Sequence, residues 1–180
     1  MHTAEQVLSF WFEEATPKQW FEKNSQFDAA IIKRFSVISE RAAKGELAYW
    51  RKSLKGRLAE IIVLDQFSRH IWRDTPRAFS QDTMALVLAQ EALKHQDFNQ
   101  LSLSQRKFIL MPFMHSESMF IHQQAVELFR ILGHDKTLEY EMQHKAIIDR
   151  FGRYPHRNII LERHSSKEEL LFLQQAGSIF

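Results

Sequence analysis

The chain has 180 residues, a formal net charge of +2 at pH 7, 44% hydrophobic residues and no cysteine. This length fits one domain with a substantial core, so folding needs neither a metal nor a cofactor. Lys and Arg are spread along the chain, and the overall charge therefore gives no support to nucleic acid binding. Without cysteine there is no disulfide framework and no cysteine-type zinc site. We expect a single domain over residues 1–180, without a cofactor.

The N-terminus and the longest apolar runs indicate where the protein resides. MHTAEQVLSFWFEE has no basic segment and carries three acidic residues, so it is not typical of a signal peptide. The run FILMPFM, residues 108 to 114, is much shorter than the ~20 residues that a membrane-spanning helix needs. We expect a cytoplasmic protein that has no membrane partner.

The first half of the chain predicts helices throughout. Only five Gly and four Pro interrupt it, and apolar residues recur at helical spacing almost everywhere. A capping box of Thr3 and Gln6 starts a helix that buries Val7, Leu8, Trp11 and Phe12. A second helix follows Thr16-Pro17. The next begins at Ser25, ends at Gly45 and buries one stripe of residues: Phe27, Ile31, Phe35, Ile38 and Ala42.

The later segments follow the same pattern. We expect helices over about 53–72, from Ser80, over 104–115 with Pro112 as a kink or stop, over 116–132, over 135–151, and after a capping box of Ser166 and Glu169. Eight or nine helices with short connections imply antiparallel helical hairpins. The all-α fold is therefore either tetratricopeptide-like or an irregular bundle. A period of 34 residues is only loosely present, without the markers of a good repeat.

The segment LDQFSRHIWRDTPRAFSQD, residues 64 to 82, carries a charged pair within an apolar helix face. Asp65 and Arg69 lie one turn apart in the favourable order. Asp65 could orient the Arg69 fork toward a carboxylate or phosphate ligand. The alternative, which we favour, is a half-buried ion pair that fixes helix packing.

The segment MPFMHSES, residues 111 to 118, places His115 and Glu117 beside a proline-disturbed helix. Their spacing points the two side chains apart in a regular helix, so a shared role needs an irregular backbone. A zinc site would need a further ligand such as His122 or His144, and the chain has no zinc motif. We therefore predict no metal site, and either a hydrogen-bonded structural histidine or a polar role in a pocket.

RFGRYPHRNIILERHSS, residues 150 to 166, is the most basic stretch. Pro155 could begin a helix after Gly152, with His156, Arg157 and Asn158 in its first turn. Basic residues are disfavoured at a positive helix end, so they need an explanation. Either they pair with acids such as Asp149 and Glu162, or they form an anion site together with the free amides of that helix start.

Taken together, these segments resemble a family of uncharacterised bacterial proteins, with some relatives in eukaryotes, in the tetratricopeptide-like helical superfamily. VLSFWF, LDQFSRHIWRDTPRAFSQD, RKFILMPFMHSES and RFGRYPHRN carry the resemblance, which covers nearly the whole chain. It implies an all-helical fold and no established activity. The family more often has Asn at His70, and Leu-Gly-Arg where this chain has Leu161-Glu162-Arg163. The second departure affects the backbone after Leu161 if that glycine has a positive φ.

The three polar segments predict a binding protein for an anionic small molecule or an acidic peptide. The expected ligand-binding residues, gathered in one Arg- and His-lined pocket, are Asp65, Arg69, His115, Glu117, Arg153, His156, Arg157 and Asn158. One alternative is an enzyme for a phosphorylated or carboxylated metabolite with His115 or His156 as general acid and base. Another is a scaffold with an apolar groove for a partner helix or peptide.

Overall fold

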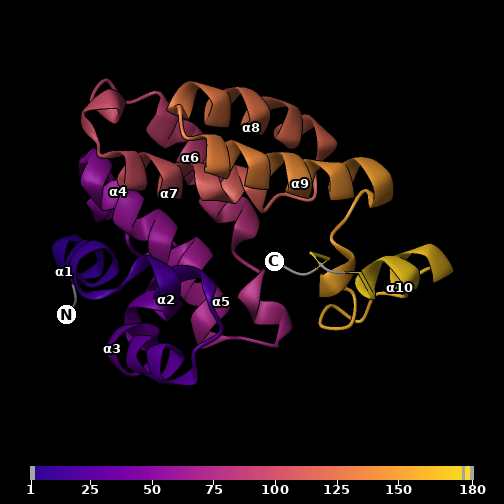
Figure 1. Ribbon diagram of the computed structural model, residues 1–180. Coiled ribbons are helices and arrows are strands. Elements are labelled where there is room, and N and C mark those ends of the chain that lie inside the picture. The colour runs from indigo at the N-terminus through magenta and orange to yellow at the C-terminus, as the bar shows by residue number, and fades with distance from the viewer. Residues whose placement is uncertain (1–2, 176, 179–180) are drawn as a thin grey trace. The chain divides into compact units, whose positions relative to one another are not determined.

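The computed structural model describes residues 3–175, 177 and 178 of the chain (Figure 1). These residues form helices and turns and contain no strand, which confirms the all-α prediction. Two compact units are present: Met1–Arg73 with Arg77–Pro112, and Asp74–Pro76 with Phe113–Phe180. Within the described part of the chain, no helix is both long enough and apolar enough to cross a bilayer.

The helices of the first unit begin and end close to the predicted positions. They are α1 (Ala4–Ser9), α2 (Pro17–Phe21), α3 (Ser25–Ala43), α4 (Leu54–Ile61), α5 (Ser68–Ile71), α6 (Asp82–Leu93) and most of α7 (Leu103–Met114). The predicted capping box of Thr3 and Gln6 is present, and a second box of Thr16 and Gln19 starts α2. The whole predicted stripe of α3 is buried.

A stretch with π-helical hydrogen bonding joins α4 to α5. It covers Ile62–Phe67, so α4, this stretch and α5 form one continuous helical segment over 54–71, close to the predicted 53–72. Counted in this way, the described residues contain nine helices, in agreement with the prediction. Every residue from 58 to 68 is buried. A helix that is buried on all sides has to satisfy its polar side chains internally.

Aromatic rings fill the core of the first unit. Trp11 is fully buried and lies 5.6 Å from the ring of Phe67 and 5.4 Å from that of Phe108, in edge-to-face contacts. Phe10, which the helical pattern did not select, is buried, whereas the predicted Leu8 and Phe12 are half-buried. The cause is a second π-helical stretch over Phe10–Glu14, which shifts the buried face of the first helix.

The second unit is built on a helical hairpin. α8 (Met119–Leu132) and α9 (Asp135–Phe151) are joined by two residues and lie side by side in opposite directions (Figure 1). Gly133, in the left-handed conformation at φ 75°, ends α8, and Gly152 at φ 67° ends α9, as predicted. α10 (Lys167–Leu173) follows the predicted capping box of Ser166 and Glu169.

Three helix starts differ from the prediction. α6 begins at Asp82 after Ser80, α7 at Leu103 before Ser104, and α8 at Met119 with Ser118 as its cap. Pro112 lies inside α7, which ends only two residues later. The helix expected from Pro155 is a single 3-10 turn, Pro155–Arg157. One turn has too few aligned peptide dipoles to attract an anion by itself.

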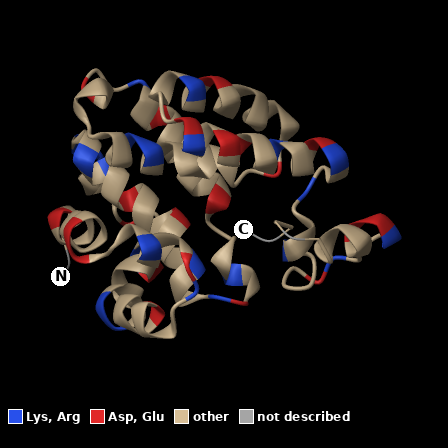
Figure 2. Cartoon of the chain, viewed as in Figure 1, with Lys and Arg blue, Asp and Glu red and all other residues tan. Residues whose placement is uncertain are grey.

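Charges of both signs alternate along the helices (Figure 2). Many of them form exposed pairs, such as Lys18 with Glu22 at 3.6 Å and Arg34 with Glu14. Exposed pairs of this kind contribute about 0–1 kcal/mol each to stability. The buried pairs described below are therefore the informative ones.

Glu162 occupies the position where the resembled family more often has glycine, and it has φ 53°. It is one of two described non-glycine residues with a positive φ, and its side chain is exposed. The left-handed conformation costs an L residue roughly 1–2 kcal/mol. The departure from the family pattern therefore places backbone strain after Leu161.

We expect Glu162→Gly to stabilise the protein. Relief of the strain exceeds the conformational entropy that glycine adds to the unfolded chain, so the free energy of unfolding should rise by about 0.5–1 kcal/mol. Urea denaturation measures this change. Glu162→Ala is the matched control, because it removes the charge and keeps the strain. A Gly variant that is no more stable than the Ala variant would contradict the claim that the backbone at Glu162 is strained.

Candidate functional site

The predicted pair of Asp65 and Arg69 exists in the first unit. Asp65 is fully buried, and its Oδ1 lies 3.1 Å from Nη1 of Arg69. Arg69 also donates two hydrogen bonds of 2.9 Å to the carboxylate of Asp82 at the start of α6. Its guanidinium lies 5.5 Å from the centre of the Phe79 ring. Two protein carboxylates therefore hold the guanidinium, as the packing interpretation expects.

His70 belongs to a second buried polar group in the same unit. Its Nδ1 lies 2.7 Å from Oδ1 of Asp28, which also accepts from Arg73. Burial lowers the pKa of His70, against the opposing effect of Asp28. Burial raises the pKa of Asp28, but the hydrogen bonds from Arg73 and His70 outweigh it, so this pKa is lowered. The pairing of residues 42 and 45 positions apart in the chain left no signal in the sequence.

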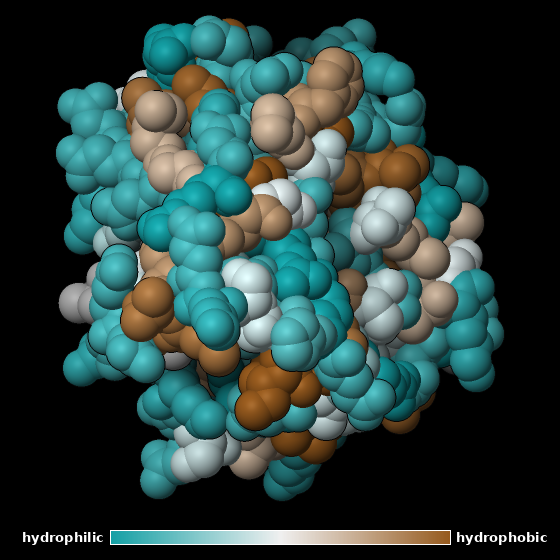
Figure 3. All heavy atoms as spheres, turned by 90° about the vertical axis from the view of Figure 1, so that its right-hand side faces the viewer, coloured by the Kyte–Doolittle hydropathy of each residue, from teal (hydrophilic) through white to brown (hydrophobic). Residues whose placement is uncertain are grey.

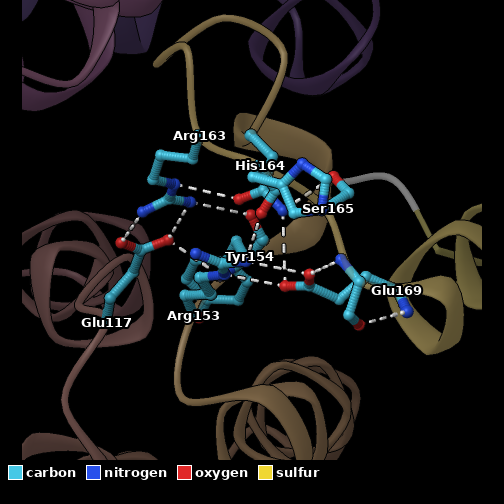
Figure 4. Close-up of polar contacts among 9 residues, drawn as sticks. Glu117, Arg153, Tyr154, Arg163, His164, Ser165 and Glu169 are labelled. Atoms are coloured by element: carbon cyan, nitrogen blue, oxygen red, sulfur yellow. Dashed lines mark hydrogen bonds and ion pairs between the residues drawn. The ribbon is translucent and has the colours of Figure 1, made fainter.

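In the second unit, Arg153 forms a two-pronged ion pair with Glu169 of α10 (Figure 4). Its Nε donates to Oε1 at 2.7 Å and its Nη2 to Oε2 at 2.9 Å. The backbone N–H of Ser166 donates to the same carboxylate at 2.7 Å. These hydrogen bonds lower the pKa of Glu169 to about 2, and the bond from Arg153 has the largest effect. Glu169 therefore has two roles. Its carboxylate completes the capping box of α10, and it also binds Arg153 of the basic stretch.

Glu117 and Arg163 form a second such pair. Arg163 donates from Nη1 to Oε2 at 2.6 Å and from Nη2 to Oε1 at 2.9 Å, and the N–H of Tyr154 donates to Oε1 at 2.7 Å (Figure 4). Burial raises the pKa of Glu117, but the bonds from Arg163 and Tyr154 outweigh it and lower this pKa. Neither acid suggested by the sequence is the partner here: Asp149 pairs with Lys145, and Glu162 is exposed.

Asn158 connects the two pairs. It is 1% exposed, and its Oδ1 accepts from Nε of Arg163 at 2.9 Å. Its Nδ2 donates to Ser165 at 3.0 Å and to Glu169 at 3.3 Å. The predicted residues Glu117, Arg153 and Asn158 therefore lie in one network, which we call the ion-pair network, together with Arg163, Ser165 and Glu169.

A second group, the Tyr154 cluster, consists of Tyr154, Arg157, His115, His122, His144, His156 and Glu141. Tyr154 is 1% exposed, and its hydroxyl donates to the carbonyl of Met114 at 2.5 Å. The ring centre lies 5.6 Å from that of His156, and the guanidinium of Arg157 lies 4.7 Å from it. Arg157 also donates to the carbonyl of His115 at 2.9 Å.

His122 and Glu141 form the fully buried base of this cluster. Nδ1 of His122 lies 2.6 Å from Oε1 of Glu141, and Nε2 lies 2.9 Å from the carbonyl of Ser116. A carbonyl only accepts, so Nε2 carries a hydrogen and the contact to Glu141 shares one proton. Burial raises the pKa of Glu141, whose Oε2 has no hydrogen-bond partner. The pair therefore carries no net charge.

His144 lies on α9, as Glu141 does, and its ring centre is 5.8 Å from that of Tyr154. Its Nδ1 donates to the carbonyl of Tyr140 at 2.7 Å, which fixes the hydrogen on Nδ1. Burial lowers the pKa of His144 to about 3, with smaller contributions from His115, His122 and His156. His144 is thus neutral at physiological pH. His115 and His156 are half-exposed and form the accessible edge of the cluster.

The structure brings six of the eight predicted residues into the second unit: Glu117, Arg153 and Asn158 in the ion-pair network, and His115, His156 and Arg157 in the Tyr154 cluster. Asp65 and Arg69 lie in the first unit. Sequence reasoning did not predict that Arg163 and Glu169 belong to the ion-pair network, or that Glu141 belongs to the Tyr154 cluster. Among the described residues, no three His, Cys, Asp or Glu side chains are placed to bind a metal ion.

We expect Glu169→Gln to lower stability in a pH-dependent way. The folded pKa of about 2 lies below the ordinary value of 4.5, so the carboxylate stabilises the fold above about pH 4.5, and this contribution is lost as the pH falls toward 2. The free energy of unfolding should fall by roughly 2–3 kcal/mol at pH 7, and the difference should shrink toward pH 3.

Urea denaturation between pH 7 and pH 3 measures this difference. Glu168→Gln is the neighbouring control, because Glu168 pairs with Arg150 at the surface and its removal should cost no more than about 1 kcal/mol. Equal losses for the two variants, or a loss at Glu169 that does not change with pH, would contradict the assigned role.

We also expect Tyr154→Phe to destabilise the protein. The substitution leaves the carbonyl of Met114 without its buried hydroxyl donor, which costs about 1–3 kcal/mol. Tyr140→Phe is the control, since Tyr140 is 44% exposed and should lose less than about 0.5 kcal/mol. Chemical denaturation compares the two variants. Similar small losses of stability in the two variants would show that the hydrogen bond of the Tyr154 hydroxyl does not stabilise the fold.

Comparisons with known proteins give the family of the chain and support its fold. The family model described as "Bacterial protein of unknown function (DUF924)" matches residues 7–177. A solved structure of a protein of unknown function from Agrobacterium tumefaciens is similar at 35% sequence identity and a TM-score of 0.89, over 95% of this chain and 96% of that one. No curated protein matches the chain. The chain therefore belongs to the DUF924 family of bacterial proteins of unknown function.

Proposed function

We propose that the protein binds a small anionic molecule, carrying a carboxylate or a phosphate, at the Tyr154 cluster of the second unit. The observation that carries this proposal is the convergence of one guanidinium and three imidazole rings on a single tyrosine ring. Arg157 lies 4.7 Å from its centre, and His122, His144 and His156 lie at 6.3, 5.8 and 5.6 Å. Arg157 brings a positive charge and His156 an imidazole at the accessible edge, while the N–H groups of His122 and His144 bind protein carbonyls behind them.

In this proposal, the ion-pair network holds the binding site in place but does not contact the ligand. Arg153 and Arg163 already bind Glu169 and Glu117 in two-pronged pairs, which use the donor geometry that an anion would need. These pairs hold the backbone on both sides of Arg157. The ligand-contacting residues are then His115, His156 and Arg157. That Asp65 and Arg69 belong to the same site stays a prediction.

The exposure of the residues fits a small ligand. His122 and Glu141 are fully buried, Arg157 is 6% exposed, and His115 and His156 are half-exposed. An anion would therefore meet His115 and His156 first and Arg157 behind them. Partial burial strengthens a charge-assisted hydrogen bond, because less water competes with it.

A peptide groove has less support. On the face drawn in Figure 3, hydrophobic residues form separate patches between hydrophilic ones. A scaffold for a partner helix would need a larger continuous apolar surface. We accordingly prefer a small anion to a partner helix in an apolar groove. The α8–α9 hairpin is the kind of unit that tetratricopeptide-like folds stack, and we include that fold and a cytoplasmic location in the proposal.

Thermal melting with phosphate, sulfate and citrate, against chloride at matched ionic strength, tests the proposal. An anion at 100 times its dissociation constant stabilises the fold by about 2.7 kcal/mol. His156→Asn and His115→Asn should each weaken anion binding about tenfold or more, since losing a charge-assisted hydrogen bond costs about 1.5–3 kcal/mol.

His164→Asn is the matched control, because His164 lies in the same basic stretch with an exposed side chain. It should leave the anion response intact. An unchanged response in the His115 and His156 variants, or an equal reduction in the His164 variant, would overturn the proposal. The enzyme alternative uses the same histidines and predicts that a bound phosphorylated or carboxylated metabolite is consumed on incubation, which chromatography detects.

A further inference from the structure

Lys107, in the first unit, is surrounded by aromatic rings. Its Nζ lies 5.4 Å from the ring centre of Trp20, 5.1 Å from that of Phe21 and 5.3 Å from that of Phe108. Two of these rings belong to α2, and the third is the next residue along α7. Lys107 itself is half-buried.

The rings form a defined enclosure. Trp20 lies 5.0 Å from Phe108 in an edge-to-face contact, and Phe21 is stacked with Phe108 at 6.3 Å. Trp20 is anchored, because its Nε1 donates to the carbonyl of Trp11 at 2.8 Å. Phe108 is fully buried, whereas Phe21 is 58% exposed. One side of the enclosure is therefore open to solvent.

Lys107 also differs from the other half-buried cations described above. Arg69, Arg73, Arg153 and Arg163 each bind a carboxylate. Within residues 3–175, 177 and 178, Lys107 forms no ion pair and no side-chain hydrogen bond, and its Nζ lies near three aromatic rings. Burial lowers the pKa of this amine, and no neighbouring charge opposes that effect.

A lowered pKa has a chemical consequence for a lysine. The neutral amine is the nucleophile, and removal of water without a compensating carboxylate increases the neutral fraction at pH 7. The attraction of the rings for the ammonium acts in the other direction but is worth only about 0.5–2 kcal/mol. The same rings offer flat apolar surfaces on which an aromatic group can stack.

We propose that Lys107 is a reactive amine that binds an aromatic aldehyde covalently as an imine. The neutral Nζ attacks the carbonyl carbon, and the π electrons of the C=O bond move to the oxygen, which takes up the proton that the nitrogen loses. The resulting carbinolamine releases its oxygen as water while the C=N bond forms. Amine and aldehyde thus give imine and water, and no oxidant or reductant takes part.

Reductive trapping tests this proposal on the full chain. The protein is treated at pH 7 with limiting benzaldehyde and cyanoborohydride, which converts each imine to a stable benzylamine, and peptide mass spectrometry gives the labelling rate at each lysine. Lys33 is the reference, because it is exposed and forms no ion pair with any described residue. We expect labelling of Lys107 to be severalfold faster than that of Lys33. Equal or slower labelling of Lys107 would overturn the proposal.

Two further experiments distinguish the reactivity of the Lys107 amine from the contribution of the aromatic rings. Formaldehyde has no ring to stack, so the preference for Lys107 should be smaller with it than with benzaldehyde; equal preferences would remove the aromatic specificity. Phe21→Ala deletes the exposed ring and admits water, so it should bring the Lys107 rate down to that of Lys33. Circular dichroism melting checks that this variant is folded. An unchanged Lys107 rate in the folded variant would refute the role of the enclosure.

Discussion

The hydrogen bond from the buried Tyr154 hydroxyl to the carbonyl of Met114 is the contact on which the polar groups of the second unit depend. It joins residues 40 positions apart, between the end of α7 and the basic stretch after α9. The backbone N–H of the same tyrosine donates to Glu117, and its carbonyl accepts from Arg163. One residue therefore uses its hydroxyl, its backbone and its ring to fix both polar groups. An unpaired polar group at such a buried position would be costly, so these bonds constrain the arrangement strongly.

The basic stretch consequently has two roles. Arg153 and Arg163 pair with carboxylates and stabilise the loop, while Arg157 and His156 lie against Tyr154. The pairing with acids considered from the sequence occurs at Arg153 and Arg163, with partners other than those suggested, and the anion site stays a proposal. The two pairs are partly buried and are weak evidence for net stability, but their two-pronged hydrogen bonds define the geometry of the loop. A preorganised geometry is what a binding site for a small anion needs.

Sequence patterns predicted the helices and many of their ends, but not the polar contacts between them. Capping boxes at Thr3 and Ser166 and the left-handed Gly152 are local signals, and they located the helix ends correctly. The resemblance made the backbone after Leu161 depend on whether the family glycine has a positive φ, and Glu162 has φ 53°. These features depend on residues within one or two helical turns, where spacing alone determines the geometry.

Long-range partners could not be predicted in the same way. Glu117 and Arg163 are 46 positions apart, and His122 and Glu141 are 19 apart, so only the packing of whole helices brings them together. The π-helical stretches at Phe10–Glu14 and Ile62–Phe67 have no simple residue pattern, and the aromatic enclosure of Lys107 joins residues of α2 and α7. One sequence contains no direct record of these contacts. Whether the three polar segments line one pocket stays a prediction.

The protonation of the histidines around Tyr154 tests the account most directly. Nitrogen-15 NMR of the protein labelled at its imidazole nitrogens distinguishes the neutral forms of histidine from the charged one as the pH is changed. Burial predicts that His144 stays neutral from pH 8 down to at least pH 5, because its pKa is about 3 despite the opposing effect of the bond to Tyr140. That bond places the hydrogen of the neutral ring on Nδ1. A His144 that gains its second proton between pH 6 and 7, as an exposed histidine does, would contradict the buried and preorganised cluster.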